Sequence, residues 1–347
     1  MAFLEALGTA VPGSPVPQSA VRAKAEEVLS VLAPDLIEKL SVFDTVGIDK
    51  RFFVRPIDWF LEEHGWAERA ALYADEGVKL LESAARQALA RAQLAPIDID
   101  GVVLVSTTGV ATPSLDARLA NKLGLRPDVT RVPVFGLGCA GGVAGVNLAA
   151  ALANANPEKR YLLLCMETCS LNFDLHDMSV RAFVATTLFA DGCAAAIFSG
   201  DRVQAKPLAR WRAGASHQWP DTERVMGWDV TDEGLRVVFS RSIPEIVARD
   251  FAPVVESFLK REAASVDRHV YHPGGTKVLE AYESALGLKP AQLATARDAL
   301  RDFGNMSSPT VLFALEASLR APLAPGETAL LAALGPGFAA ELALLEG

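Results

Sequence analysis

Residues 134–142 read VFGLGCAGG, which places Cys139 after a short apolar run and among four glycines, at 136, 138, 141 and 142. This stretch predicts a strand, a sharp turn and a helix, because glycine tolerates the backbone angles that such turns need. Cys139 would open the helix, where the partial positive charge of the helix N-terminus favours the nucleophilic thiolate. The alternative is a buried structural cysteine whose glycines serve only close helix packing.

Apolar runs alternate with helical patterns on both sides of this stretch. The alternation predicts an α/β fold with mostly buried strands. The expected helix at 139–154 is apolar on nearly every face, so we expect it to be buried. The other expected helices span 70–92, 113–124, 177–188, 244–264, 276–285, 291–303 and 308–320, and the expected strands span 101–108, 132–137, 161–167, 193–199 and 268–272, with two more in 328–347.

Composition and charge limit the functions that this chain can have. Its 347 residues are half hydrophobic and carry a net charge of −9, with no basic block, which argues against a nucleic-acid partner. The N-terminus lacks the pattern of a signal peptide, and the apolar stretch at 328–347 is broken by Gly-Pro-Gly. We therefore expect a cytoplasmic protein without a membrane span.

The four cysteines, at 139, 165, 169 and 193, lie in apolar runs. In a cytoplasmic chain this setting predicts free thiols rather than disulfides. The spacing from Cys165 to Cys169 is the one feature typical of a metal site. No cluster of Cys or His completes four ligands, so we expect no metal.

Two further stretches carry residues that suit chemistry together with Cys139. His272 ends the apolar strand RHVYH and is followed by Pro-Gly-Gly, which places it at a strand tip. Asn305 lies in GNMSSP, directly before a helix that Ser307 or Ser308 can cap. Taken singly, His272 could be an ordinary core or turn histidine, and Asn305 an ordinary turn residue.

Together the three residues supply a nucleophile, a general base and an amide donor, which acyl transfer through a thioester requires. A papain-like protease uses the same three residue types at a similar separation of Cys and His. Such a protease carries its cysteine near the mature N-terminus, in a Cys-Gly-Ser-Cys-Trp-like setting. Cys139 has neither feature.

The motifs GLGCAGG, LFADG, YHPGG, GNMSSP and LGPGF follow one another in this order along the chain. In this respect the sequence resembles the chalcone synthase-like, or type III polyketide synthase, family of the thiolase superfamily. The resemblance implies a five-layered αβαβα thiolase-like fold made of two similar halves, and a homodimer. The N-terminal half, 1–204, would carry the nucleophilic Cys139, and the C-terminal half, 205–347, would carry His272 and Asn305.

The resemblance also implies the roles of individual residues. Cys139, as a thiolate paired with His272, would attack an acyl-CoA starter and hold its acyl group. Malonyl-CoA would then lose CO₂, and His272 and Asn305 would stabilise the resulting enolate. CoA thioesters would be substrates, and no cofactor is implied. The remaining matches are Phe189 as a gatekeeper between the CoA tunnel and the cavity, Ser307 in the cavity wall, and Gly335, Pro336 and Gly337 in the loop at its floor.

Several positions depart from the plant enzymes of the family. Val237 falls at a second gatekeeper aromatic, and Cys169 and Asn172 fall at two cavity threonines. Thr112 falls where the dimer partner contributes a methionine. A valine in place of a ring predicts a more open entrance, which would admit aliphatic starters and favour alkylpyrone or alkylresorcinol products. The alternative is that a neighbouring side chain such as Phe239 fills the space.

The basic residues that bind CoA are poorly retained. Lys39 matches, while the other positions are apolar and Lys50 or Arg51 could substitute for them.

Two other functions stay open: a ketoacyl carrier-protein synthase III that makes a single condensation, and an inactive binding protein of the same fold. The sequence leaves the starter, the number of extensions and the mode of ring closure undetermined.

Overall fold

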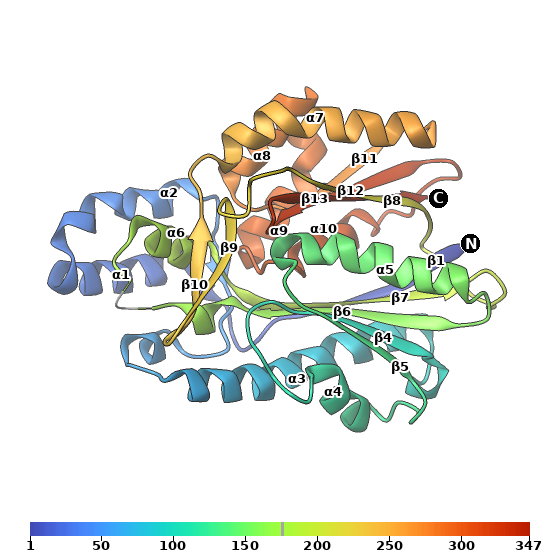
Figure 1. Ribbon diagram of the computed structural model, residues 1–347, viewed down its shortest axis with the longest axis horizontal. Helices are drawn as coiled ribbons and strands as arrows, with labels where there is room; N and C mark the ends of the chain where they lie inside the picture. The colour runs from blue at the N-terminus through green and yellow to red at the C-terminus, as the bar shows by residue number, and fades with distance from the viewer. Residues whose placement is uncertain (175–176) are drawn as a thin grey trace.

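One long β-sheet supplies two separate layers of the molecule (Figure 1). The computed structural model describes residues 1–174 and 177–347. The strand order in this sheet is β11-β12-β13-β8-β1-β7-β6-β4-β5. These strands are β1 (Ala2–Ala10), β4 (Gly101–Val105), β5 (Thr130–Val134), β6 (Arg160–Thr168), β7 (Asp191–Gly200), β8 (Ala209–Gln218), β11 (Arg268–Tyr271), β12 (Thr328–Gly335) and β13 (Ala339–Glu346).

Strand β1 joins the two layers. It pairs antiparallel with β7 along its length, while its first residues, Ala2 to Leu4, also pair with β8. Strands β4, β6 and β7 are almost wholly buried, which explains why their sequences are apolar without alternation. The edge strand β5 is instead partly exposed, so the expectation of a buried strand there is wrong.

Helices form three layers around these two layers of strands (Figure 1). α5 (Gly141–Ala155) and α10 (Thr310–Ser318) lie in the middle and contact strands of both halves. α3 (Trp66–Ala92) and α4 (Leu115–Leu123) cover the first half, and α7 (Ile243–Glu262) and α8 (Thr276–Leu286) cover the second. The expected αβαβα fold is therefore confirmed.

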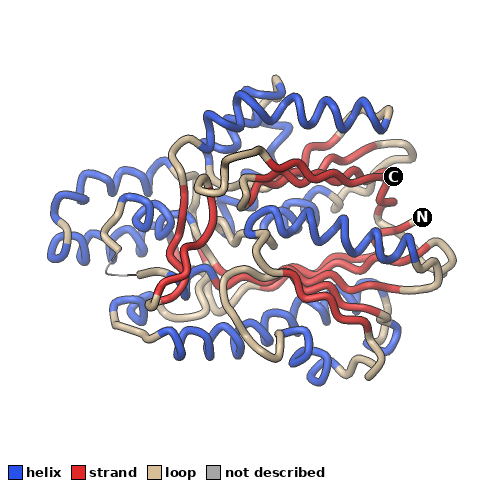
Figure 2. The backbone as a smooth tube through the Cα atoms, viewed as in Figure 1, coloured by secondary structure: helices blue, strands red, loops and turns tan. Residues whose placement is uncertain are grey.

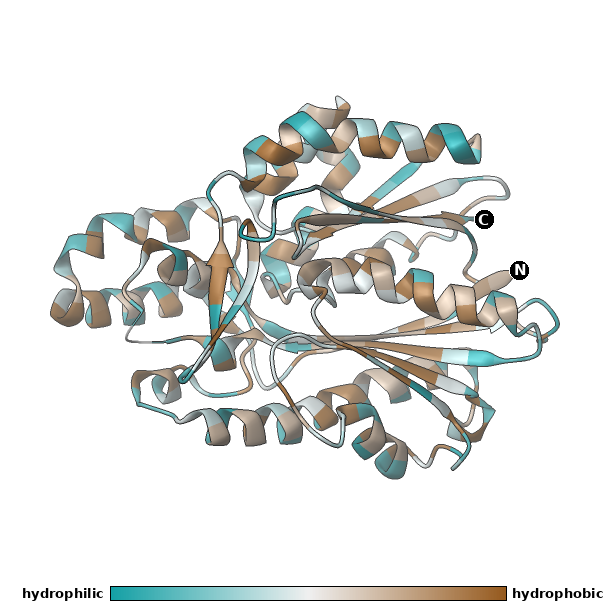
Figure 3. Cartoon of the chain, in the orientation of Figure 1, coloured by the Kyte–Doolittle hydropathy of each residue, from teal (hydrophilic) through white to brown (hydrophobic). Residues whose placement is uncertain are grey.

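The middle and outer helices differ in composition as their positions require. α7 alternates hydrophilic and hydrophobic residues, as a helix with one face in water does (Figure 3). α5 instead contains Gly141, Gly142 and Gly145, and a side chain at any of them would overlap neighbouring residues. At Gly142, for example, a Cβ atom would collide with the carbonyl of Ser308. Close packing between the layers therefore depends on these small residues.

The remaining elements gather at one side of the layers. The hairpin of β9 (Met226–Thr231) and β10 (Gly234–Phe239) stands across the ends of the sheet (Figure 2). Beside it lie the N-terminal helices and α6, as Figure 1 shows. These elements are α1 (Gln18–Leu32), α2 (Val42–Thr45) and α6 (Val180–Leu188), with the short strands β2 (Val16–Pro17) and β3 (Lys50–Arg51). The helix α9 (Ala294–Phe303) instead packs beside α10 (Figure 1).

Every helix and strand expected from the sequence is present, with bounds shifted by a few residues. The expected helix 139–154 begins at Gly141, because Gly138–Ala140 forms a 3₁₀ turn. Elements that the sequence did not reveal are the helices α1 and α2 and the strands β1, β2, β3, β8, β9 and β10. The division at residue 204 falls in the connection between β7 and β8, and it stays a prediction.

Candidate active site

Cys139 lies in a tight turn between β5 and α5. Gly136 and Gly138 have positive φ angles of 95° and 48°, which residues with side chains rarely adopt. The backbone N–H of Gly138 donates to Thr107 Oγ1 at 3.1 Å, which fixes the turn against β4. The predicted sharp turn is therefore present, and the glycines also serve close packing, so both interpretations of these glycines hold.

His272 and Asn305 approach this turn from the second half of the chain. His272 directly follows β11, and its backbone N–H donates to Ala332 O at 2.7 Å. Asn305 Nδ2 donates to Gly274 O at 3.1 Å, so the amide is anchored two residues beyond the histidine. His272 is 2% exposed and Asn305 is 1% exposed. The structure thus buries both side chains at the junction of the two halves.

The LFADG and GNMSSP motifs are held together by backbone hydrogen bonds. Asn305 N donates to Leu188 O at 3.0 Å, and Ala190 N donates to Asn305 O at 2.9 Å. Phe189, between these two residues, is the expected gatekeeper. Main-chain hydrogen bonds therefore hold Phe189 next to Asn305.

Ser307 holds a strained backbone conformation next to Asn305. Its φ angle is 62°, which is uncommon for a residue other than glycine. The Ser307 N–H donates to Asn305 Oδ1 at 2.8 Å, and this bond fixes the amide orientation. Hydrogen bonding of Ser307 and Asn305 with Cys139 lowers the pKa of the thiol, so all three side chains meet at one place.

Burial sets the protonation of the nucleophile and the histidine. It raises the pKa of the Cys139 thiol to about 11, an effect that Ser307 and Asn305 offset only in part. It also lowers the pKa of His272 to about 3. Neither ring nitrogen of His272 has a hydrogen-bond partner among the described residues. Burial therefore opposes the thiolate that a position at the helix N-terminus would favour.

Alkylation of the free enzyme tests this protonation state. Below a pKa of about 11 the thiolate fraction of Cys139 rises about tenfold with each pH unit. We expect the rate of Cys139 alkylation by iodoacetamide to rise in this way between pH 7 and 10, as followed by peptide mass spectrometry. A rate that is constant over this range would instead indicate a thiolate already formed by proton transfer to His272.

A narrow cavity opens at Cys139. Its lining contains Phe189, Cys169, Val237, Ser307 and Pro336, as the sequence predicted. It leaves room for only about 30 Å³, close to the volume of one water molecule. Five further lining residues come from the β9–β10 hairpin: Met226, Gly227, Trp228, Val238 and Phe239. Of these, the sequence indicated only Phe239, as a neighbour that could fill the space at Val237.

The ring that the sequence lacks at Val237 is supplied by neighbours. Val237 pairs with Trp228 on β9, and both side chains line the cavity together with Phe239. Val237 also packs against the buried cluster of Cys169, Ala185 and Phe189. The more open entrance expected at Val237 is therefore not found in this structure.

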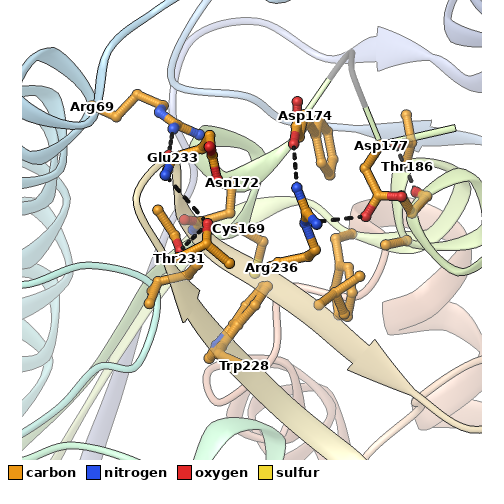
Figure 4. A pocket seen from close by; sticks show the side chains of 17 residues that line it. Arg69, Cys169, Asn172, Asp174, Asp177, Thr186, Trp228, Thr231, Glu233 and Arg236 are labelled. Atoms are coloured by element: carbon orange, nitrogen blue, oxygen red, sulfur yellow. Dashed lines mark hydrogen bonds and ion pairs between the residues drawn. The ribbon is translucent and has the colours of Figure 1, made fainter. Parts of the chain in front are cut away.

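The pocket in Figure 4 adjoins the cavity through Cys169, Phe189, Trp228 and Val237. Asn172 lines this pocket, as the sequence predicted for a cavity position, and its Nδ2 donates to Thr108 O at 2.9 Å. Arg236 crosses the pocket and lies 3.7 Å from an oxygen of Asp174 and 3.6 Å from one of Asp177.

An apolar hollow of about 120 Å³ lies on the far side of this pocket. The two share Phe173, Asp174, Asp177, Ala182 and Thr186. The hollow is lined mainly by aliphatic and aromatic side chains from α1, the 3₁₀ helix Pro34–Ser41, α6 and the connection between β3 and α3, including Leu29, Leu36, Phe53, Phe60 and Phe183. Such a lining suits an aliphatic ligand better than a charged one.

Not every predicted substrate-binding residue lies in the cavity. Gly335 is packed so closely against Leu137 and Ala140 that a side chain there would collide with them. Gly337 O accepts hydrogen bonds from Gln218 and Thr222, so this glycine anchors the loop that carries Pro336.

Thr112 and Lys39 lie outside the cavity of this chain. Thr112 is exposed, and Lys39 is half exposed, with its Nζ 2.6 Å from Glu38.

Arg51 cannot substitute as a CoA contact. It is fully buried, and its guanidinium donates to Gln18 Oε1 and to the backbone carbonyls of Thr186 and Phe189. The suggestion from the sequence is wrong for this residue, which instead supports the gatekeeper segment. Lys50 is partly exposed and lies 3.9 Å from Asp302, outside the cavity lining.

Glu167 is a buried residue near the site that the motifs did not reveal. Its carboxylate accepts hydrogen bonds from the backbone of Thr107 and Thr108, from Thr108 Oγ1, and from Ser308 Oγ at 2.7 Å. Burial raises its pKa to about 7. Glu167 thereby ties β6 to the GNMSSP loop and to the threonines beneath Cys139. In the sequence, this buried glutamate could have been found as the charged residue at the end of the apolar run YLLLCME.

Two other features concern metals and membranes. All four cysteines are free, and the described residues contain no group of three or more His, Cys, Asp or Glu that could hold a metal ion. In the same part of the chain, Gly138–Ala155 is the one helical stretch with the length and composition of a membrane span. It includes α5, which is buried between the layers of strands, and buried core helices share this composition.

Comparisons with known proteins agree with this geometry. The family model for the N-terminal domain of chalcone and stilbene synthases matches residues 1–202, and the model for their C-terminal domain matches 212–347. The 1,3,6,8-tetrahydroxynaphthalene synthase of Streptomyces peucetius is 39% identical over 87% of this chain and 81% of its own. An "alpha-pyrone synthesis polyketide synthase-like" protein of Mycobacterium tuberculosis is 30% identical over 98% of this chain and 90% of its own.

Solved structures give the same answer. The 1,3,6,8-tetrahydroxynaphthalene synthase of Streptomyces coelicolor, a bacterial type III polyketide synthase, superposes with a TM-score of 0.93 at 29% identity, covering 99% of each chain. The sequence motifs, the fold and the relatives all indicate one family. This chain belongs to the chalcone and stilbene synthases, and it is a type III polyketide synthase, an acyltransferase that catalyses decarboxylative Claisen condensation.

Proposed function

We propose that Cys139 carries the growing chain, with His272 and Asn305 as its catalytic partners. His272 accepts the thiol proton as Cys139 Sγ attacks the carbonyl carbon of an acyl-CoA, and the CoA thiol leaves with a proton. Malonyl-CoA then loses CO₂, and the enolate carbon attacks the acyl group on Cys139, which releases the cysteine. Repetition of these steps and ring closure give the product.

One observation carries this proposal: a buried histidine without a hydrogen-bond partner lies in the same junction as an anchored amide and the nucleophile. Since an unpaired buried polar group is costly, such groups tend to serve a ligand or a reaction. Asn305 donates one of its two amide hydrogens to Gly274 and keeps the other for an enolate oxygen. In a buried site these donors would be strong.

For the substrate, we propose an aliphatic acyl-CoA starter and an alkylpyrone or alkylresorcinol product. The cavity at Cys139 is too small for a long chain, but the pocket beside it shares part of its lining with the apolar hollow between α1 and α6, which could take the chain. A relative whose name refers to pyrone synthesis supports this class.

Val237→Phe tests the proposal, because an added ring in a packed wall is poorly accommodated. We expect the ratio of kcat/KM for lauroyl-CoA to that for hexanoyl-CoA to fall by about tenfold or more. Steady-state kinetics with both starters measures it. Val230→Phe is the matched control, since Val230 is 81% exposed on β9. An unchanged ratio in Val237→Phe would remove the basis for the aliphatic assignment while leaving the mechanism standing.

Two other functions make different products. A synthase III-like enzyme would stop after one condensation, and an inactive binding protein would form no acyl-enzyme at all. Incubation with malonyl-CoA and a panel of acyl-CoA starters, followed by product mass spectrometry, distinguishes the three.

We also propose that the enzyme is a cytoplasmic homodimer that uses CoA thioesters without a cofactor. Val110 and Phe135, which flank the Cys139 region, are 57% and 59% exposed. Large exposed apolar side chains are typical of an interface, and Thr112 follows Val110 by two residues. Light scattering of the purified protein would give the mass of a dimer.

A further inference from the structure

Two hollows of different charge share lining residues with the cavity at Cys139. On one side lies the pocket in Figure 4, where the carboxylates of Asp174, Asp177 and Glu233 outnumber the cations of Arg69 and Arg236. On the other side, Val238 and Phe239 also line a hollow of about 400 Å³. The second hollow is basic, because its lining contains three arginines, at 181, 224 and 241, and no carboxylate.

Two of these arginines are available to a ligand. Arg224 donates two hydrogen bonds to Asp229, at 2.6 and 2.9 Å, so its charge is largely compensated. Within the described ranges 1–174 and 177–347, neither Arg181 nor Arg241 forms an ion pair, and both are exposed. Positive charge is therefore concentrated here although the chain as a whole carries −9.

Backbone dipoles reinforce this charge. Ser179 caps α6, a helix of 9 residues, and its Oγ accepts from Ala182 N at 3.2 Å. Ser240 and Arg241 directly precede the turn into α7, a helix of 20 residues. The N-termini of both helices thus adjoin the basic hollow, and helix N-termini favour anions.

We propose that Arg181 and Arg241 bind the phosphate groups of the CoA thioester, whose pantetheine arm passes Phe239 to reach Cys139. This inference rests on the proposed function and assigns the CoA contacts that the sequence left open. Arginine suits this role because its planar guanidinium pairs with phosphate through two hydrogen bonds. Lys39, the match from the sequence, lines neither hollow and is paired with Glu38. The acidic pocket on the other side would repel the same phosphates.

The double variant Arg181→Gln/Arg241→Gln tests the assignment. With acyl-CoA and malonyl-CoA we expect KM to rise about 10- to 100-fold, because each lost arginine removes charge-assisted hydrogen bonds. The kcat value should change little. With the corresponding N-acetylcysteamine thioesters, which have no phosphate, kcat/KM should equal that of the parent enzyme. Arg249→Gln is the control, since Arg249 is exposed on α7, bonded to Asp250 and outside the hollow.

The possible outcomes separate this inference from the proposed function. An unchanged KM for CoA substrates in the double variant would overturn the inference, and so would an equal loss with the N-acetylcysteamine thioesters. Calorimetry with free CoA gives a readout besides turnover. If the parent protein uses no thioester but binds CoA, and the double variant binds it at least tenfold more weakly, the inference stands while the proposed function fails. Absence of CoA binding by the parent would overturn the inference.

Discussion

Replacement of Cys139 by alanine is expected to abolish covalent acylation and polyketide formation while some malonyl-CoA decarboxylation remains. The reason is that acylation needs the thiol itself, whereas decarboxylation needs only donors for the enolate oxygen. His272 and Asn305 keep their anchoring to Ala332 and Gly274 when the thiol is removed. Intact-protein mass spectrometry measures acylation, and CO₂ release from malonyl-CoA measures the remaining step.

Cys165→Ala is the matched control for this variant. Cys165 is fully buried in β6 and lies in the sheet core away from the cavity lining. We expect this variant to be acylated like the parent enzyme. Acylation that persists in Cys139→Ala, on Cys169 for example, would contradict the assignment of the nucleophile.

Asn305→Ala is expected to reduce malonyl-CoA decarboxylation by about 10²- to 10³-fold while acylation of Cys139 stays largely intact. Loss of one well-placed donor to an oxyanion has a cost of this size. The starter reacts with Cys139 before any enolate forms, so it should be less sensitive to the amide. Single-turnover acylation and steady-state decarboxylation measure the two steps separately.

A second variant separates chemistry from folding at this position. Asn305 also accepts from Ser307 N and donates to Gly274 O, so alanine removes two structural hydrogen bonds. Asn305→Asp keeps an oxygen for Ser307 but lacks the amide donor. We expect its decarboxylation to fall at least as far as in Asn305→Ala. Equal losses of acylation and decarboxylation in both variants would contradict the role of Asn305 as an enolate donor.

The layers of the fold could be predicted from the sequence because its central elements have unusual compositions. The helix after Cys139 is apolar and rich in small residues on nearly every face, and such a helix has to be buried. The β9–β10 hairpin, with GWDVT and GLRVVF, mixes polar and apolar residues and gives a weak strand signal. β1 was missed because AFLEALGTA lies outside the alternation that identified the other strands.

The candidate site was predictable where motifs carry it and unpredictable where distant segments meet. Cys139, His272 and Asn305 each lie in a glycine- or proline-rich turn that follows a recognisable element. Trp228, in contrast, enters the cavity only because β9 pairs with β10 opposite Val237. Arg51 was wrongly predicted as a possible CoA contact because arginine is rarely buried. Three internal acceptors hold its guanidinium in the core.

The most direct test of the central claim is intact-protein and peptide mass spectrometry of the parent enzyme after incubation with an acyl-CoA starter and malonyl-CoA. We predict that the acyl group is found on the peptide that contains Cys139. We also predict released products that contain the starter plus more than one two-carbon unit. An enzyme that forms no adduct on Cys139, or that releases only products of a single condensation, would contradict the account.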